Sequence, residues 1–348
     1  MSQSVDKTCL IADVGGTHAR FALSVSNSEL LECVHVFRCS EFSGLESAIQ
    51  AYLSLLADLN MPYPSFACFA LAGPVHNNEI HLTNNEWVID KQRMAQKFSF
   101  SSAYLNDFSA QGYCLPALLP AEIVQWQAGA KGVGTAKESH NARAIVGPGT
   151  GFGVCVVSKA GEVLESEMGQ CTFAPSTPHE LALLQCLWDS YARVSIEHLL
   201  SGSGIANIFF ANVLLQGRPG MSSLSRDDVR AQDVVELARD GNVLAQRSMR
   251  DFNAILGSVC GDIALASSCL SGLFLTGAIL DKIADVFEVE VFLERFCDKG
   301  SFRGWCKEVP IYRIKHPYPG LLGCSVYAQR NAEKMGNTWM PAGLVNEL

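Results

Sequence analysis

Two glycine-rich turns, each set between two apolar runs, constrain the fold of this chain more than any other feature. The first reads Asp13-Val14-Gly15-Gly16-Thr17 and the second Gly147-Pro148-Gly149-Thr150-Gly151-Phe152-Gly153. The flanking runs have the composition of strands: residues 9–12 and 20–23 for the first turn, and 144–146 and 154–157 for the second. Glycine lets such a turn adopt positive φ and brings bare N–H groups close to a ligand. Because consecutive N–H groups form a concave anion site, the pair predicts a phosphate clamp with two lobes.

The length and charge of the chain indicate a globular protein with two domains. Its 348 residues exceed the size of about 250–300 residues at which single cores stop growing. Hydrophobic residues make up 48% and charged residues 18%, as in ordinary globular proteins. The net charge is −9 without long runs of one sign, which argues against nucleic acid or a membrane surface as the main partner. We expect a small α/β domain at residues 1–117, joined by a closing helix at about 326–348, and a large α/β domain at 118–325.

The cysteines and the apolar segments predict a cytoplasmic protein without a membrane span. The thirteen cysteines are scattered and form no C-x-x-C motif, which favours reduced thiols. The first ten residues lack the basic and apolar regions of a secretory signal. Residues 263–280 are uncharged, but they contain three serines and a strand pattern. We therefore expect the end of a buried helix followed by a core strand.

Helices alternate with buried strands along the chain, which predicts α/β layers around a mixed or parallel sheet. Further strands are expected at residues 65–72, 102–105, 272–275 and 309–314, and helices at 45–56, after Gly277 and from Gly320. Residues 178–268 are expected to be mainly helical, with Ser195 capping a short helix and Ser225 and Asp228 forming a capping box before another. The two halves share one layout, a glycine hairpin followed by strands and helices.

Asp13 is the first candidate for chemistry, because it ends a buried strand directly before the first glycine turn. Such an aspartate can simply bond its own backbone in a turn. Beside a phosphate-binding turn, its carboxylate is a suitable ligand for Mg²⁺, which prefers hard oxygen ligands. Thr17 and Arg20 can donate to the same phosphates, whereas a structural role is expected for His18.

Three further sites carry polar side chains in suggestive places. Asn106 and Asp107 lie where a strand runs into a helix, the usual edge for ligands in open α/β sheets. Both residue types are also good helix caps, so the pair favours capping when taken alone. At that edge Asp107 can also act as a general base for a hydroxyl nucleophile, with Asn106 as a ligand contact. Glu167 and Glu197 are surface residues or ligands of vicinal sugar hydroxyls.

Other catalytic motifs are missing from the sequence. It contains no G-x-x-x-x-G-K-[ST] motif, no Rossmann glycine spacing that opens a helix, and no G-x-S-x-G elbow. No histidine has the spacing of a zinc site.

Seven segments, in order along nearly the whole chain, resemble the bacterial glucokinase family. They are Asp13-Val-Gly-Gly-Thr-His-Ala-Arg, Leu82-Thr-Asn-Asn-Glu-Trp, Leu105-Asn-Asp-Phe, Gly147-Pro-Gly-Thr-Gly-Phe-Gly, Ser201-Gly-Ser-Gly, Thr276-Gly-Ala-Ile and Pro319-Gly-Leu-Leu-Gly. The resemblance implies the two-domain actin-like ATPase (ribonuclease H-like) fold with a cleft between the domains. It also implies a homodimer that phosphorylates the 6-hydroxyl of glucose with ATP, the first step of glycolysis.

The resemblance also implies roles for individual residues. In the family, the residue at Asp13 binds Mg²⁺ directly or through water, and those at Gly15, Gly16 and Thr17 bind the terminal phosphates. Gly149, Thr150 and Gly151 match the second phosphate loop, and Gly277 matches a residue near the nucleotide. Asp107 resembles the general base, and the sugar ligands match Asn106, Asp107, Glu167, Gln170 and Glu197.

One segment departs from the family pattern. Where the family usually reads Glu-Gly-Gly-His, this chain reads Glu167-Met168-Gly169-Gln170, so an amide replaces the imidazole that contacts the sugar. His18, where Asn is common, is a smaller departure. A mismatch of donors and acceptors in a buried polar site costs about 1–3 kcal/mol. Two alternatives therefore stay open: a kinase for mannose, fructose or an N-acetylhexosamine, and a sugar-binding regulator without catalysis. The sequence does not distinguish ATP from polyphosphate as the phosphoryl donor.

Overall fold

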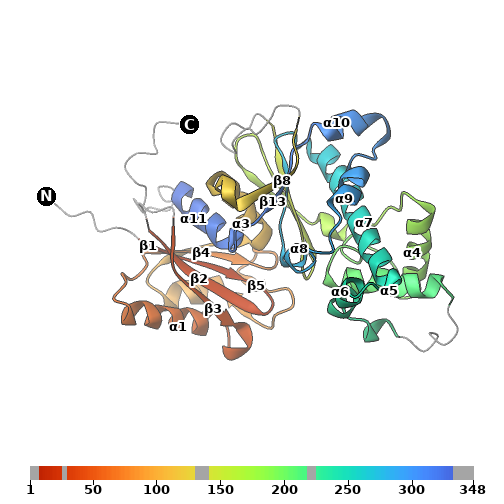
Figure 1. The fold of residues 1–348 in the computed structure, drawn as a ribbon. Coiled ribbons are helices and arrows are strands. Elements are labelled where there is room, and N and C mark those ends of the chain that lie inside the picture. Colours follow the sequence, from red (N-terminus) through yellow and green to blue (C-terminus); the bar gives the residue numbers. More distant parts are fainter. Residues whose placement is uncertain (1–7, 26–29, 130–140, 218–224, 332–348) are drawn as a thin grey trace. The chain divides into compact units, whose positions relative to one another are not determined.

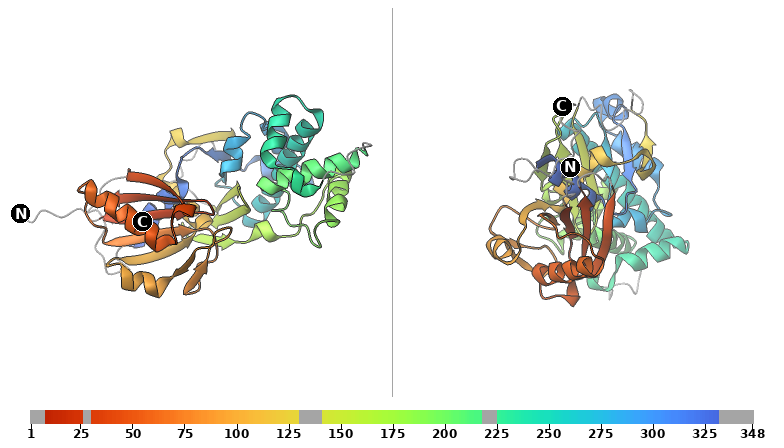
Figure 2. Two further views of the ribbon diagram at one scale, coloured as in Figure 1. Left: turned by 90° about the horizontal axis from the view of Figure 1, so that it is seen from below. Right: turned by 90° about the vertical axis from the view of Figure 1, so that its left-hand side faces the viewer.

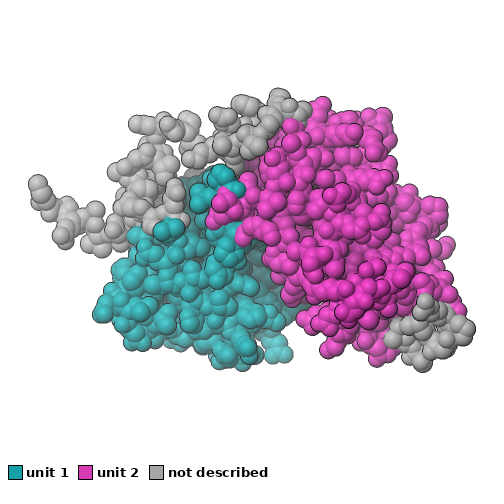
Figure 3. Space-filling model, in the orientation of Figure 1, with its two compact units in different colours: residues 1–120, 316–348 teal, residues 121–315 magenta. Residues whose placement is uncertain are grey.

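The chain divides into two compact units, which Figure 3 distinguishes by colour. Unit 1 comprises Met1–Pro120 and His316–Leu348, and unit 2 comprises Ala121–Lys315. The computed structural model describes residues 8–25, 30–129, 141–217 and 225–331. The boundaries expected from the sequence lie after residues 117 and 325. The expected closing helix lies outside the described residues from position 332 onward.

Unit 1 is built on a mixed sheet whose strands follow the order β3-β2-β1-β4-β7 (Figure 1). Strand β1 pairs antiparallel with β2 and parallel with β4, which in turn pairs parallel with β7. The small hairpin β5–β6 forms a separate two-stranded sheet. The elements are β1 (Thr8–Val14), β2 (His18–Val25), β3 (Leu31–Arg38), η1 (Cys39–Glu41), α1 (Leu45–Asp58), β4 (Phe66–Leu71), β5 (Glu79–His81), β6 (Val88–Asp90), α2 (Lys91–Lys97), β7 (Ser101–Asn106), α3 (Asp107–Cys114), η2 (Leu115–Ala117) and α11 (Pro319–Asn331).

Helices cover both faces of the unit 1 sheet, because successive side chains of a strand point to opposite faces. Leu10 and Ala12 of β1 belong to the core that includes the apolar face of α1. Cys9 and Ile11 belong to the opposite core, which contains residues of α3 and α11. The continuous apolar runs of β1 and β4 therefore reflect burial on both faces.

Unit 2 repeats this layout with the strand order β11-β10-β9-β12-β13-β8. Its glycine hairpin β9–β10 is antiparallel, and β9 continues parallel to β12 and β13, as β1 continues to β4 and β7 in unit 1. The elements are η3 (Pro120–Glu122), which begins at the unit boundary, β8 (Ile123–Gln127), β9 (Arg143–Pro148), β10 (Phe152–Val157), β11 (Val163–Ser166), η4 (Met168–Gln170), α4 (Pro178–Trp188), α5 (Gly202–Leu215), η5 (Arg226–Asp228), α6 (Ala231–Arg239), α7 (Val243–Ser267), β12 (Leu273–Leu275), α8 (Ala278–Lys282), α9 (Val289–Phe296), η6 (Gly300–Phe302), α10 (Arg303–Lys307) and β13 (Ile311–Ile314). Figure 2 shows helices α4–α7 gathered on one side of unit 2.

Two helix starts differ from the expectation. Ser195 caps no helix: residues 196–199 form a turn, and Ser195 itself pairs with Thr172 in an isolated bridge. The cap of the next helix, α5, is Ser201, whose hydroxyl accepts the Gly204 N–H. Ser225 and Asp228 form the expected capping box, but it encloses the short η5 before α6 begins.

The uncharged segment of residues 263–280 divides as predicted into the end of α7 and the core strand β12. Among the residues that the structure describes, no helix combines the length and apolarity needed to cross a bilayer. All thirteen cysteines are free thiols.

Asn253 of α7 offers a test of core packing, because its side chain is fully buried and neither amide atom has a partner among the described residues. Leucine has the same branched shape without the polar atoms. We expect Asn253→Leu to raise the free energy of unfolding by about 1 kcal/mol, because an unpaired buried polar group is costly. Chemical denaturation measures this change.

A matched control is Asn212→Leu in α5. The Asn212 amide is equally buried but donates to Ser248 Oγ at 3.0 Å and to Asp251 Oδ2 at 2.8 Å. We expect this variant to lose about 2 kcal/mol. Equal destabilisation of both variants would contradict the unpaired state of Asn253.

Candidate active site

The first glycine turn joins β1 to β2 and is closed by backbone hydrogen bonds. Gly15 N–H donates to His18 O at 3.0 Å, and Cys39 N–H donates to Thr17 O at 2.9 Å. The Thr17 hydroxyl lies 3.0 Å from His18 Nδ1. His18 therefore contributes to the geometry of the turn, which agrees with the structural role expected for it.

A second segment, for which no role was expected from the sequence, braces this turn. Asn85 Nδ2 donates to Gly15 O at 3.2 Å, and Asn85 Oδ1 accepts the Trp87 N–H. A Cβ atom at Gly16 would lie 2.9 Å from Asn84 O, so only glycine fits this close approach. Both asparagines belong to one of the seven family segments, which was the available signal.

Asp13 is the last residue but one of β1, just before the turn, with 22% of its side chain exposed. Its Oδ2 atom lies 3.7 Å from Arg20 Nη1. Burial raises the pKa of the Asp13 carboxyl, and the nearby charge of Arg20 lowers it. The start of α11 also lies close, because a Cβ at Gly320 would be 2.9 Å from Asp13 Cγ.

The donor set at Asp13 fits Mg²⁺. The described residues contain no cluster of three or more His, Cys, Asp or Glu that could hold a metal ion. Mg²⁺ needs no such cage, because it keeps several waters and is commonly bound by one or two carboxylates together with substrate phosphates. A partly exposed carboxylate beside a glycine turn meets that requirement.

Asn106 and Asp107 lie on the same sheet edge as Asp13. The parallel strands β1, β4 and β7 are in register, with Val14 opposite Leu71 and Leu71 opposite Asn106. The carboxyl ends of these strands therefore form one edge, the place where open α/β sheets bind ligands.

The Asn106 side chain caps α3. Its Oδ1 accepts the N–H groups of Phe108 and Ser109 at 3.0 and 3.2 Å, and its Nδ2 donates to Gly73 O at 3.3 Å. The capping alternative therefore holds for Asn106. The half-buried Asp107 begins the helix, and its Oδ1 accepts the Phe108 N–H at 3.0 Å.

The second glycine turn lies against the start of α5 and the segment before α8. Gly149 N–H donates to Gly151 O at 2.8 Å, and Gly149 O accepts the Gly202 N–H at 2.9 Å. Thr150 is exposed at the tip. Gly277 has a φ of +107°, and a Cβ there would lie 2.5 Å from Pro148 O. The structure therefore brings Gly149, Thr150, Gly151 and Gly277 together.

Glu197 connects this turn to Gln170. Its Oε2 accepts the Phe152 N–H at 2.9 Å, and its Oε1 accepts from Gln170 Nε2 at 3.1 Å. A Cβ at Gly151 would lie 2.4 Å from Glu197 Oε2. Glu167 is exposed on the same short segment as Gln170, and its carbonyl accepts the Gln170 N–H at 2.9 Å.

Buried side chains of α5 hold the loop that carries Glu197. Asn207 is fully buried, donates to His198 O at 2.7 Å and accepts from the Tyr191 hydroxyl at 3.3 Å. The rings of Tyr191 and His198 stack with centroids 4.1 Å apart. Burial lowers the pKa of His198, and its Nδ1 lies 3.0 Å from the Ser195 N. No sequence motif indicated Asn207 or His198.

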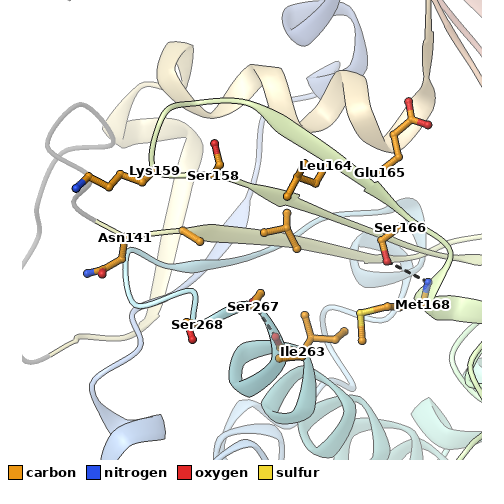
Figure 4. Close-up of a pocket in the computed structure, with 13 residues that line it drawn as sticks. Asn141, Ser158, Lys159, Leu164, Glu165, Ser166, Met168, Ile263, Ser267 and Ser268 are labelled. Carbon is orange, nitrogen blue, oxygen red and sulfur yellow. Dashed lines mark hydrogen bonds between the residues drawn. The ribbon is translucent and has the colours of Figure 1, made fainter.

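The side chain of Met168 turns toward the core of unit 2, which accommodates the departure at this position. Met168 packs against the main core and forms part of the wall of a cavity of about 580 Å³ between β10–β11 and the end of α7 (Figure 4). Its N–H donates to Ser166 Oγ at 3.2 Å. The added bulk therefore lies in this wall.

Two α/β units with matching strand order, each with a glycine turn after its first central strand, are the arrangement of the actin-like ATPase fold. Solved structures share the fold. A glucokinase from an Antarctic psychrotroph superposes with a TM-score of 0.79 at 32% identity, covering 92% of this chain and 98% of that one. A ROK family glucokinase from Streptomyces griseus, in complex with glucose and AMPPNP, has a TM-score of 0.60 at 16% identity, covering 93% and 99%.

The sequence comparisons are more specific than the fold. The model of the family described as Glucokinase matches residues 10–331. A glucokinase of Xylella fastidiosa (strain M12) is 36% identical over 335 residues, which cover 92% of this chain and 94% of that protein. The chain belongs to the glucokinase family.

Proposed function

We propose that this protein transfers the terminal phosphoryl group of ATP to the 6-hydroxyl of glucose, giving glucose 6-phosphate and ADP. The observation that carries the proposal is the shared sheet edge of unit 1, where Asp13, the first glycine turn and Asp107 lie at the ends of neighbouring strands. Phosphoryl transfer requires mainly alignment and charge neutralisation, together with a group that orients the nucleophile. Family membership supports glucose as acceptor and ATP as donor.

In unit 1, one group of residues would bind the phosphates of ATP, and Asp107 would act on the attacking hydroxyl. Gly15, Gly16 and Thr17 offer donors to the terminal phosphates, and Asn84 and Asn85 hold their turn in shape. Asp13 would hold Mg²⁺, directly or through water, which supplies charge neutralisation at the transferring group when bound. Asp107 accepts the proton of the attacking hydroxyl.

The residues of unit 2 supply a second turn and polar groups for the sugar. Gly149, Thr150, Gly151 and Gly277 would contact the nucleotide. Glu167, Gln170 and Glu197 would bind hexose hydroxyls, since carboxylates accept and an amide both donates and accepts. In unit 1, Asn106 would bind a hexose hydroxyl while it caps α3.

Gln170 keeps a change of sugar preference open, because an amide stands in the position where the family usually has an imidazole. A kinase for mannose, fructose or an N-acetylhexosamine is therefore the second candidate. A non-catalytic sugar-binding regulator and polyphosphate as donor are also to be tested. The homodimer, the cytoplasmic location and the lack of nucleic acid and membrane partners stay predictions.

The test is ADP release with Mg-ATP and a panel of glucose, mannose, fructose and N-acetylglucosamine, repeated with polyphosphate through hexose phosphate formation. We expect the highest kcat/KM with glucose and ATP. Preference for another hexose would replace the acceptor but keep the reaction. Glucose binding without any ADP release would contradict a kinase and favour the regulator.

A further inference from the structure

The Glu197 carboxylate occupies a backbone donor directly beside the predicted phosphate turn. Its Oε2 accepts the N–H of Phe152, the residue that directly follows Gly149-Thr150-Gly151. Phe152 is buried, with 4% of the residue exposed. The same oxygen would lie 2.4 Å from a Cβ at Gly151, so the carboxylate lies directly against the turn.

The Glu197 carboxylate in this position opposes the binding of a phosphate group, which is also an anion. N–H groups of a glycine turn attract phosphate because of their partial positive charge. A carboxylate bound to one of them neutralises part of that charge, and it repels phosphate oxygens at short range. In the structure, the second glycine turn is therefore already in contact with an anion, the Glu197 carboxylate.

Gln170 and Arg193 hold the other end of this carboxylate. Gln170 Nε2 donates to Glu197 Oε1 at 3.1 Å, and Arg193 Nη1 donates to Gln170 O at 2.6 Å. Glu197 is partly exposed and Gln170 is exposed, so both can be reached by a ligand. A carboxylate accepts several hydrogen bonds, and hexose hydroxyls are donors that compete with the Phe152 N–H for it.

We propose that Glu197 couples hexose binding to nucleotide binding. With the hexose site empty, its carboxylate lies on the second glycine turn and weakens the binding of nucleotide phosphates. Hexose hydroxyls then draw the negative charge toward the sugar and leave the turn more attractive to phosphate. This inference rests on the proposed function, since it assumes that unit 2 binds a hexose and a nucleotide.

The proposed coupling between hexose and nucleotide binding favours phosphorylation of the sugar over hydrolysis of ATP. Nucleotide affinity is low until the sugar is bound, which limits ATP hydrolysis by water. Because coupling between two ligands is reciprocal, nucleotide must also strengthen hexose binding by the same factor. Gln170 acts here as a positioning residue, because it orients Glu197.

The decisive variant is Glu197→Gln, with the Kd of AMPPNP measured by titration calorimetry in the presence of Mg²⁺. Glutamine keeps the shape and a carbonyl acceptor for the Phe152 N–H but removes the charge. Without glucose, we expect AMPPNP to bind about three- to tenfold more tightly to Glu197→Gln than to the wild type. Glucose should strengthen AMPPNP binding in the wild type and do so less in the variant. A purely structural role of Glu197 predicts the opposite sign, weaker AMPPNP binding.

Glu167→Gln is the matched control. It removes the same charge from an exposed residue of the segment that carries Gln170, whereas the carboxylate that bonds to the Phe152 N–H is that of Glu197. We expect it to weaken glucose binding and to leave the Kd of AMPPNP without glucose unchanged. Equal effects of the two variants would overturn the inference, because a general charge effect would then explain both.

If Glu197→Gln lowers the stability of the protein, a second variant tests the inference. Gln170→Met preserves size but removes the donor to Oε1, so the charge of Glu197 concentrates on the turn. We expect weaker AMPPNP binding without glucose. Unchanged AMPPNP binding in both Glu197→Gln and Gln170→Met would overturn the coupling alone. A wild type that binds neither ligand would instead contradict the proposed function.

Discussion

Asp107→Asn should lower kcat for glucose phosphorylation by about 10²–10⁴-fold, the usual contribution of a general base. Asparagine has the shape of aspartate but cannot take the hydroxyl proton. The fold of the helix should persist, because the cap of α3 is the neighbouring Asn106. Nucleotide affinity should stay unchanged, as measured by AMPPNP titration, while a coupled assay measures kcat.

The control for Asp107 is Asp90→Asn in the same unit. Asp90 caps α2 by accepting the N–H groups of Gln92 and Arg93 at 2.8 and 3.1 Å. Asparagine caps equally well, so kcat and thermal stability should both stay at wild-type levels. Near-normal turnover by Asp107→Asn would remove Asp107 as the base and would direct the search to another acceptor on this sheet edge.

Gly323→Ala should strongly lower the stability of unit 1. Gly323 of α11 faces α3, and a Cβ there would lie 1.6 Å from Ala110 O and 3.2 Å from Cys114 N. The two helices must separate, because the obstacle is backbone. We expect a loss of more than about 3 kcal/mol, at the upper end of overpacking effects. Thermal and denaturant unfolding measure it.

Activity should fall together with stability in Gly323→Ala. Helix α3 begins at Asp107, and α11 begins beside Asp13 through Gly320. A shift between these helices therefore moves the base relative to the predicted Mg²⁺ ligand. The control is Gly304→Ala in α10, where nothing lies within 4 Å of the new Cβ. There we expect a change of at most about 1 kcal/mol in the stabilising direction. Similar losses in both variants would contradict the helix contact as the cause.

Most of the strands that the sequence predicted are central ones, and β7, predicted at residues 102–105, is the one at a sheet edge. Strands β1, β4, β9 and β12 are buried on both faces and appear as continuous apolar runs. The larger strands that it missed, β3, β8 and β11, all lie at sheet edges. An edge strand is half-exposed and has one pairing partner, so its sequence needs no apolar run. Leu164 of β11 is 55% exposed, for example.

The candidate site divides in a similar way. The glycine turns and the acidic residues next to strand ends could be found in the sequence, because backbone geometry requires glycine there and short polar side chains follow strands. Asn84 and Asn85 stand out in the sequence only as members of a family segment, because their contacts are with the distant first glycine turn. Asn207 carries no sequence signal, because its role depends on the loop that it holds. Their spacing follows no period that local structure would impose.

The sequence by itself determined the two glycine turns, the central strands and the family of this protein, because these depend on local backbone requirements and on residue identity. Only the tertiary structure decided the partners of each polar side chain. In the tertiary structure, the Asn106 side chain caps α3, and the Glu197 carboxylate lies between Gln170 and the second glycine turn. A hydrogen bond depends on where two segments meet in space, and packing of the two cores fixes that meeting point.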